Sequence, residues 1–256
     1  MSTEAITAYR PGLKSLGTMV VSEAKMVIRD AGGLVIPVLA PMVILVMTAG
    51  QVSAESGSSG LSGLETYVLP LVFGIALAAI GVINMPSFLA YYRKTGVLRR
   101  LAVIPVSPAM VLVSQVLVST IQAIIGVGAA LTLGVVVFNA SLPPNALVMA
   151  GVLLLALGSM YGVGMIVSAF SPSPNSAVAI GLMTFFFLGA MGGMFGGMEA
   201  IPDVIAPAAQ YLPFGAAMEA TAAVWAGESP DLTNILAMAG WTVIGGIVAA
   251  RFFRWE

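Results

Sequence analysis

Long apolar stretches without a charged residue dominate the chain, and short polar connections separate them. Six of these stretches are near the about 20 residues that a helix needs to cross the hydrocarbon core of a bilayer. They cover residues 33–52, 66–89, 107–138, 145–169, 176–196 and 232–250. The pattern predicts an all-α integral membrane protein with six transmembrane helices, which form one transmembrane domain over residues 1–256.

An amphipathic segment precedes the first apolar stretch, over residues 13–30. On a helical wheel, one side carries Leu13, Leu16, Val20, Ala24 and Val27, and the other carries Lys14, Thr18, Ser22, Lys25 and Arg29. A helix with one apolar and one basic side lies in the plane of the membrane interface. We therefore predict an amphipathic helix at the cytoplasmic membrane surface. It has either a specific role or only that of an ordinary anchoring helix.

The segment 197–231 is apolar enough to suggest a seventh crossing, but it carries acids and prolines. These are Glu199, Asp203, Glu219 and Glu228, with Pro202, Pro207 and Pro213. Irregular backbone at membrane depth requires protein or water to satisfy its polar groups. We therefore predict a short outer re-entrant helical hairpin between spans five and six, with helices at about 203–211 and 214–226.

Positive charge is confined to three zones, and this predicts the topology. The basic residues are Arg10, Lys14, Lys25, Arg29, Arg93, Lys94, Arg99, Arg100, Arg251 and Arg254. Lysine and arginine near membrane spans are retained on the cytoplasmic side. The N- and C-termini, the 90–106 loop and the 171–175 turn are therefore expected in the cytoplasm. The acidic connections are expected outside, among them the Gly/Ser-rich external loop 53–65, which ends at Glu65.

The composition supports this class and excludes several kinds of chemistry. The chain is 59% hydrophobic and 8% charged, whereas soluble domains are near a quarter charged, and it has no cysteine and no histidine. Disulfides, thiolate catalysis and the usual zinc sites are thereby excluded. Nothing in the sequence indicates binding to nucleic acid, and no catalytic, cofactor or metal site is predicted.

No Asp, Glu, Lys, Arg or His lies within any of the predicted spans. Carriers driven by protons usually hold an ionisable group within the membrane, so this absence argues against that mechanism. Candidates for helix contact or for a substrate pathway are Asn84, Gln115, Gln122, Phe185, Phe186, Met194 and Met198. Glycines four residues apart, such as Gly158 and Gly162 and several pairs between 189 and 197, predict close helix packing or a hinge.

The first basic loop combines cations with exposed apolar residues. The candidate interaction residues are Arg93, Lys94, Thr95, Gly96, Val97, Leu98, Arg99, Arg100 and Leu101. The rule of internal positive charge explains the cations but does not require the apolar residues between them. A short helix that presents Leu98 and Leu101 fits a groove on a cytoplasmic partner.

Three features together resemble the permease subunits of ABC-2 type exporters, the class that includes daunorubicin-resistance permeases. The first is the run from Lys94 to Leu101, which leads to Ile104-Pro105-Val106-Ser107-Pro108. The second is the fifth span, which is followed in the chain by Gly196–Pro202 and then by Tyr211-Leu212-Pro213. The third is the amphipathic segment before the first span. The sequence departs from the family pattern at Arg93 and Lys94, where many relatives have acidic residues. The usual Ser-Gly of the fifth span is also replaced by a run rich in glycine and methionine.

The resemblance implies a permease subunit in the plasma membrane of a prokaryote. It would pair with a second permease copy or a sister permease, contact membrane lipids, and sit on a separate ATPase subunit that binds ATP and Mg²⁺. The 90–106 loop would then be the coupling loop, and a hydrophobic or amphiphilic substrate such as a drug, lipid or glycolipid would be exported. A stand-alone secondary carrier or channel without nucleotide coupling is the alternative, and a scaffold subunit without its own pathway is a third possibility.

Overall fold

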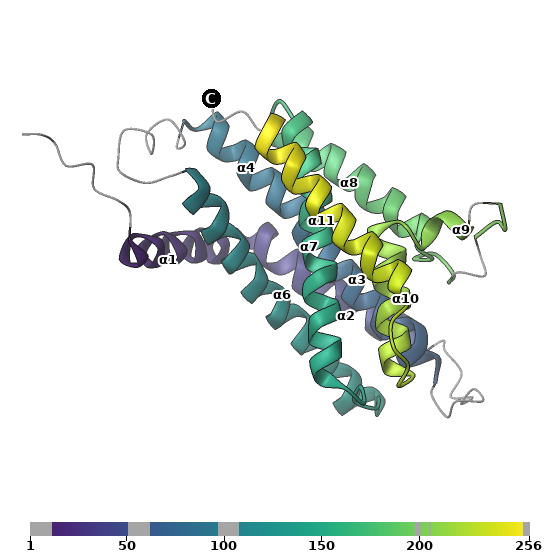
Figure 1. Cartoon of the computed structure of the whole chain (residues 1–256). Helices are drawn as coiled ribbons and strands as arrows, with labels where there is room; N and C mark the ends of the chain where they lie inside the picture. Colours follow the sequence, from purple (N-terminus) through teal and green to yellow (C-terminus); the bar gives the residue numbers. More distant parts are fainter. Residues whose placement is uncertain (1–11, 51–61, 97–107, 198–200, 205, 253–256) are drawn as a thin grey trace, which may run out of the picture.

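The computed structural model describes residues 12–50, 62–96, 108–197, 201–204 and 206–252, and this part of the chain is helical without strands (Figure 1). The prediction of an all-α fold is confirmed. The helices are α1 (Leu13–Arg29), α2 (Ala31–Ala49), η1 (Leu64–Val68), α3 (Leu69–Ala78), η2 (Ala79–Asn84), α4 (Met85–Lys94), α6 (Pro108–Phe138), α7 (Ala146–Phe170), α8 (Pro174–Met191), α9 (Ala206–Ala209), α10 (Pro213–Trp225) and α11 (Leu232–Phe252).

Within these ranges, five helices are long and apolar enough to cross a membrane. They are Leu64–Lys94, Met110–Phe138, Ala146–Phe170, Pro174–Met191 and Leu232–Arg251. The first predicted span, over residues 33–52, corresponds to α2, whose apolar part Val35–Ala49 is shorter. Multiple membrane crossings therefore follow from the structure, while the exact number of six remains a prediction.

The helix Leu64–Lys94 forms the centre of the bundle. It joins η1, α3, η2 and α4 without a break, and 89% of its most apolar stretch is buried. Its π-helical segment η2 is contacted by two neighbouring helices through glycines. A Cβ on Gly164 of α7 would overlap the carbonyl of Gly81, and one on Gly181 of α8 would lie 2.7 Å from the oxygen of Val82. Only residues without side chains allow α7 and α8 to come so close.

Close packing also joins α7 to α11, where the predicted glycine pair Gly158 and Gly162 lies. A Cβ on Gly162 would overlap the Trp241 carbonyl, and one on Gly245 would overlap the backbone of Gly162. The prediction of close helix approach is confirmed for this pair. Close approach also occurs at Gly192, where a Cβ would lie 2.8 Å from the amide nitrogen of Gly215 in α10. Gly193 and Gly197 instead adopt φ values of 83° and 80° in the turn after α8, which ends at Met191.

Figure 1 shows α1 lying across the bundle, whereas α2, α6, α7, α8 and α11 run along it. The ends of α4, α7 and α11 and the starts of α6 and α8 gather at one end of the molecule. We call this the basic end, since Arg93, Lys94 and Arg251 lie in its helix termini. The arrangement agrees with the prediction that these segments lie on the same side of the membrane. That this side is the cytoplasmic one remains a prediction.

The opposite end is held together by Glu65, which we expected in an exposed loop. Its side chain is instead buried, and its carboxylate accepts hydrogen bonds from Ser62 and from the backbone amide of Ser141, at 3.0 Å in the latter case. The indole of Trp225 donates to the carbonyl of Ser141 at 3.0 Å. Three segments distant in sequence therefore meet at Ser141.

The segment in which we predicted a hairpin contains two helices of unequal length. The first, α9, has four residues where we expected nine, and it begins at Ala206, with Pro207 in its first turn. The second, α10, starts at Pro213, which occupies the first turn where its missing amide costs nothing. Nearly all of α10 is buried against α3, α7, α8 and α11, so it is part of the bundle. Its depth in the membrane remains a prediction.

Candidate functional site

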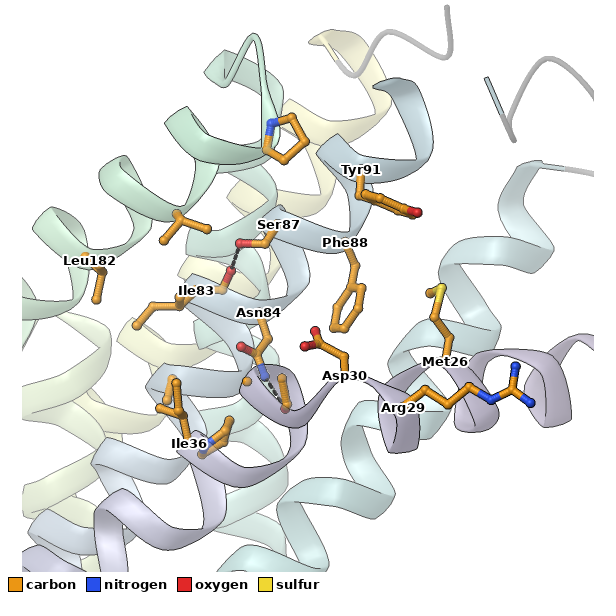
Figure 2. A pocket seen from close by; sticks show the side chains of 16 residues that line it. Met26, Arg29, Asp30, Ile36, Ile83, Asn84, Ser87, Phe88, Tyr91 and Leu182 are labelled. Atoms are coloured by element: carbon orange, nitrogen blue, oxygen red, sulfur yellow. Dashed lines mark hydrogen bonds between the residues drawn. The ribbon is translucent and has the colours of Figure 1, made fainter. Parts of the chain in front are cut away.

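A cavity of about 700 Å³ lies near the junction of α1 and α2, between that junction, the η2–α4 segment and α8 (Figure 2). Its lining is mainly apolar. The lining side chains come from five elements: Met26, Arg29, Asp30, Gly32, Gly33, Ile36, Pro37, Ala79, Ile83, Asn84, Ser87, Phe88, Tyr91, Pro174, Val178 and Leu182. Ile36 of α2 and Leu182 of α8 are substantially exposed, so the cavity is accessible laterally between these two helices. Asp30 and Tyr91 are exposed too, so the cavity is also accessible beside the α1–α2 junction.

One wall of the cavity is formed by a hydrogen-bonding arrangement around Gly33. The carbonyl of Gly33 lies four residues before Pro37, which has no amide hydrogen to donate to it. Asn84 Nδ2 and Gln122 Nε2 donate to this oxygen at 2.7 and 2.6 Å. Two neighbouring helices thus satisfy a backbone group that the proline leaves unpaired, as buried polar groups in a membrane require.

The other predicted pathway candidates lie away from this cavity. Phe185 is buried and Phe186 exposed on α8, with ring centroids 5.3 Å apart, while Met194 lies in the turn that follows. Gln115 is buried, and its amide has no hydrogen-bond partner in the described part of the chain. Met198 lies outside the described residues. Among the described candidates, Asn84 alone lines the cavity.

The turn after α8 is held by Tyr67. Its hydroxyl donates to the carbonyl of Gly193 at 3.0 Å and accepts from the amide of Gly197 at 3.2 Å. Sequence reasoning missed this residue, because Tyr67 and the turn are separated by more than 120 positions. The glycine-rich run is therefore an anchored turn in this structure.

The start of the predicted coupling loop is connected to the end of α7. The guanidinium of Arg93 donates from Nη2 to the carbonyls of Ser168 and Ser171 at 2.8 and 2.9 Å. A cation at a helix C-terminus also interacts favourably with the helix dipole. Lys94 and Thr95 are exposed, and Gly96 ends the helix with φ of 67°. Val97, Leu98, Arg99, Arg100 and Leu101 lie outside the described residues.

A second contact at the basic end attaches α1 to α4. The hydroxyl of Tyr92 donates to Glu23 Oε2 at 2.6 Å, and both side chains are buried. Burial raises the pKa of Glu23, and the hydrogen bond from Tyr92 partly offsets this effect. Sequence reasoning did not single out Glu23, although it falls at helical spacing from Leu16, Val20 and Val27 on the apolar side of α1.

Nothing in the described ranges resembles a catalytic or metal centre. No group of three or more acidic side chains that would hold a metal ion is found there. The arrangement consists of a lateral cavity, helix contacts through glycine, and two attachments at the basic end.

Comparison with known families decides the class. The sequence model of one family, described as ABC-2 family transporter protein, matches residues 29–251. The chain belongs to the ABC-2 transporter family. A search of curated proteins found no significant match. ABC-2 permeases are transmembrane components that are generally not catalytic themselves and normally work with an ABC ATPase.

The match to the ABC-2 family includes every lining residue of the cavity except Met26. It also includes Arg93 and its acceptors at the end of α7. The cavity and the basic end are therefore parts of the ABC-2 permease domain itself, whereas most of α1 precedes the matched region.

Proposed function

We propose that this permease is the membrane subunit of an ATP-driven exporter and moves a hydrophobic or amphiphilic substrate, such as a drug or lipid-like molecule, outward. The observation that carries the proposal is the mainly apolar cavity that opens sideways between α2 and α8 in an ABC-2 permease. Such a cavity admits an amphiphile from the bilayer without exposing its apolar part to water. The chain has no ATPase site of its own in this proposal, and a separate subunit supplies ATP and Mg²⁺.

The topology of the proposal follows the charge pattern. Both termini and the basic end face the cytoplasm, and the Glu65 end faces outward. The protein then resides in the plasma membrane of a prokaryote, with lipids around it and a second permease copy or a sister permease beside it. The cavity lies near the cytoplasmic leaflet, on the side from which an exporter collects its substrate.

Coupling to the ATPase would proceed through the segment 90–106. Because Arg93 binds the end of α7, a force applied to this loop reaches both α4 and the turn 171–173. That turn leads directly into α8, one wall of the cavity. Movement of the ATPases would therefore change the spacing of α8 from α2.

The test replaces Leu98 or Leu101 by Asp in the permease co-expressed with the ATPase subunit from a neighbouring reading frame. We expect loss of co-purification and of ATP-dependent transport, with the permease itself still monodisperse. Leu142→Asp is the matched control, since Leu142 is exposed in the connection at the opposite end. Unchanged association in the two variants would contradict the proposal, and ion-driven flux through the purified chain alone would favour a stand-alone carrier.

A further inference from the structure

Two residues that line the cavity carry a charge, and they point in opposite directions. In Figure 2 the carboxylate of Asp30 is directed into the cavity, beside Phe88 and Asn84. The guanidinium of Arg29 extends away from it, along the outer side of α1. The charge that a bound molecule meets inside the cavity is therefore negative.

Gly33 provides the space for this carboxylate. A Cβ at Gly33 would lie 2.7 Å from Asp30 Oδ2 and 3.1 Å from Phe88 Cζ. The carboxylate and the edge of the aromatic ring therefore converge on the same position, which a side chain on Gly33 would fill. Any other residue at this position would displace one of them.

The carboxylate of Asp30 is not used to hold the described part of the structure together. Asp30 is the N-cap of α2, yet its side chain makes no capping hydrogen bond. No hydrogen-bond or ion-pair partner for it is found within the described ranges. Asp30 is exposed and has no protein partner there, so its carboxylate is available to a cationic ligand.

Aromatic and apolar surfaces continue from this carboxylate. Phe88 and Tyr91 line the cavity next to Asp30. The Cζ edge of Phe88 points to the same position as the carboxylate, and the faces of the two rings are the surfaces that attract organic cations. Ile36, Val178 and Leu182 line the part that opens between α2 and α8. The cavity thus has a negatively charged aromatic region and an apolar region that leads toward the bilayer.

The dipoles of the neighbouring helices do not reverse the preference of the cavity for a cationic ligand. α1 ends at Arg29 and α2 begins at Ala31, so a partially negative and a partially positive helix end meet at Asp30. Their contributions offset each other, and the side-chain charge decides which ligand is favoured. An anionic headgroup would face the carboxylate of Asp30 and would find the guanidinium of Arg29 directed elsewhere.

We propose that the cavity recognises amphiphiles with an organic cation as headgroup. The cation lies beside Asp30 and Phe88, and the apolar body lies between Ile36 and Leu182. The inference rests on the proposed function and names the class of its substrate. A free lipophilic amine and an aminolipid share this chemistry.

The experiment measures binding of two probes with the same shape and opposite charge, tetraphenylphosphonium and tetraphenylborate. The full chain is purified in maltoside detergent, whose headgroup has no charge, and equilibrium dialysis against empty micelles corrects for partitioning. We expect retention of tetraphenylphosphonium above the micelle background and none of tetraphenylborate. Competition by added phosphatidylethanolamine shows whether an aminolipid occupies the site, and its absence restricts the class to free organic cations.

Asp30→Asn should weaken tetraphenylphosphonium binding about tenfold or more, because it removes the charge and keeps the size. Phe88→Leu should weaken it about threefold through loss of the cation–π contact. Asp203→Asn is the matched control, since this exposed carboxyl lies outside the cavity, and it should leave binding unchanged.

Equal affinity of the Asp30→Asn and Asp203→Asn variants, or equal binding of the two probes by the unmodified chain, would overturn the inference. Neither result bears on the ATPase association tested above, because the dialysis uses no ATPase. Loss of association in Leu98→Asp together with equal probe binding would leave the exporter proposal intact and reject the cation preference.

Discussion

The side-chain amides of Asn84 and Gln122, from the central helix and from α6, both donate to one atom, the carbonyl oxygen of Gly33. This oxygen has no partner within α2, because Pro37 occupies the position that would supply one. The arrangement explains why two amides within apolar stretches are compatible with a stable bundle. It also links three helices beside the candidate cavity.

A mutant series should reveal this shared acceptor. We expect Asn84→Leu or Gln122→Leu alone to cost about 0.6 kcal/mol of unfolding free energy, since one donor remains. The double variant should cost more than the sum, because the carbonyl then has no donor. In a Pro37→Ala background, α2 regains its own hydrogen bond and the non-additivity should disappear. Steric-trapping measurements in bicelles would give the unfolding free energies of the series. If the two single substitutions were additive in the chain that keeps Pro37, the shared acceptor would be contradicted.

Two adjacent glycines of α11 should respond in opposite ways to alanine. Gly245→Ala places a methyl group against the backbone of Gly162 and should cost about 1–3 kcal/mol, with poor assembly of α7 and α11. Gly246→Ala meets no atom within 4 Å and should be neutral or stabilising through its helix propensity. Thermal unfolding in detergent compares the two variants, and similar melting temperatures would show that α7 and α11 do not pack as described.

Replacing Arg93 should destabilise the permease even without an ATPase present. Arg93→Gln removes a charged donor from two carbonyls at the end of α7, an effect of about 1.5–3 kcal/mol. Lys94→Gln, at the exposed neighbouring position, is the control and should change the melting temperature little. If Arg93→Gln retained full stability and lost only ATPase association, its role would be in coupling alone.

The attachment of α1 should depend on pH through Glu23. Because burial raises the pKa of Glu23, the folded state favours the protonated carboxyl. Its contribution to stability is therefore present below the ordinary pKa of glutamate and is lost as the pH rises through the raised value. We expect hydrogen-exchange protection of α1, corrected for intrinsic rates, to fall over this interval.

Glu23→Gln should make the protection of α1 nearly independent of pH, because the amide oxygen still accepts from Tyr92. Glu228→Gln, at an exposed position, is the control and should follow the unmodified protein. Parallel pH profiles for the Glu23→Gln variant and the unmodified chain would assign the pH dependence to another group.

Apolar run length was enough to predict the helices, because each span must satisfy its own backbone hydrogen bonds. The family could also be inferred from the order of the Lys94–Pro108 run and the later glycine and proline motifs, and the match over residues 29–251 confirmed it. Helix ends were harder to predict. The fifth span was extended to residue 196, whereas α8 ends at Met191 because glycines with positive φ follow.

The site could not be predicted to the same extent, since it depends on contacts between distant segments. Asp30 appeared in the sequence only as one acid within a basic zone, and nothing in its neighbourhood indicated Phe88 as a neighbour. Glu65 was expected in a solvent-exposed loop, because its attachment to Ser141 requires the bundle to be assembled first. The freed carbonyl at Gly33 was a detectable signal, as a proline inside a helix always leaves one acceptor for other groups.

The enclosure of the helix from Leu64 to Lys94 has a consequence for how the protein responds to its surroundings. Since most of this helix touches protein and not acyl chains, its length is not constrained by the thickness of the bilayer. A thinner or thicker membrane acts first on the outer helices, above all α6, α8 and α11, which bury much smaller shares of their apolar stretches. A change in lipid composition will therefore tilt the outer helices, while the enclosed central helix keeps its position.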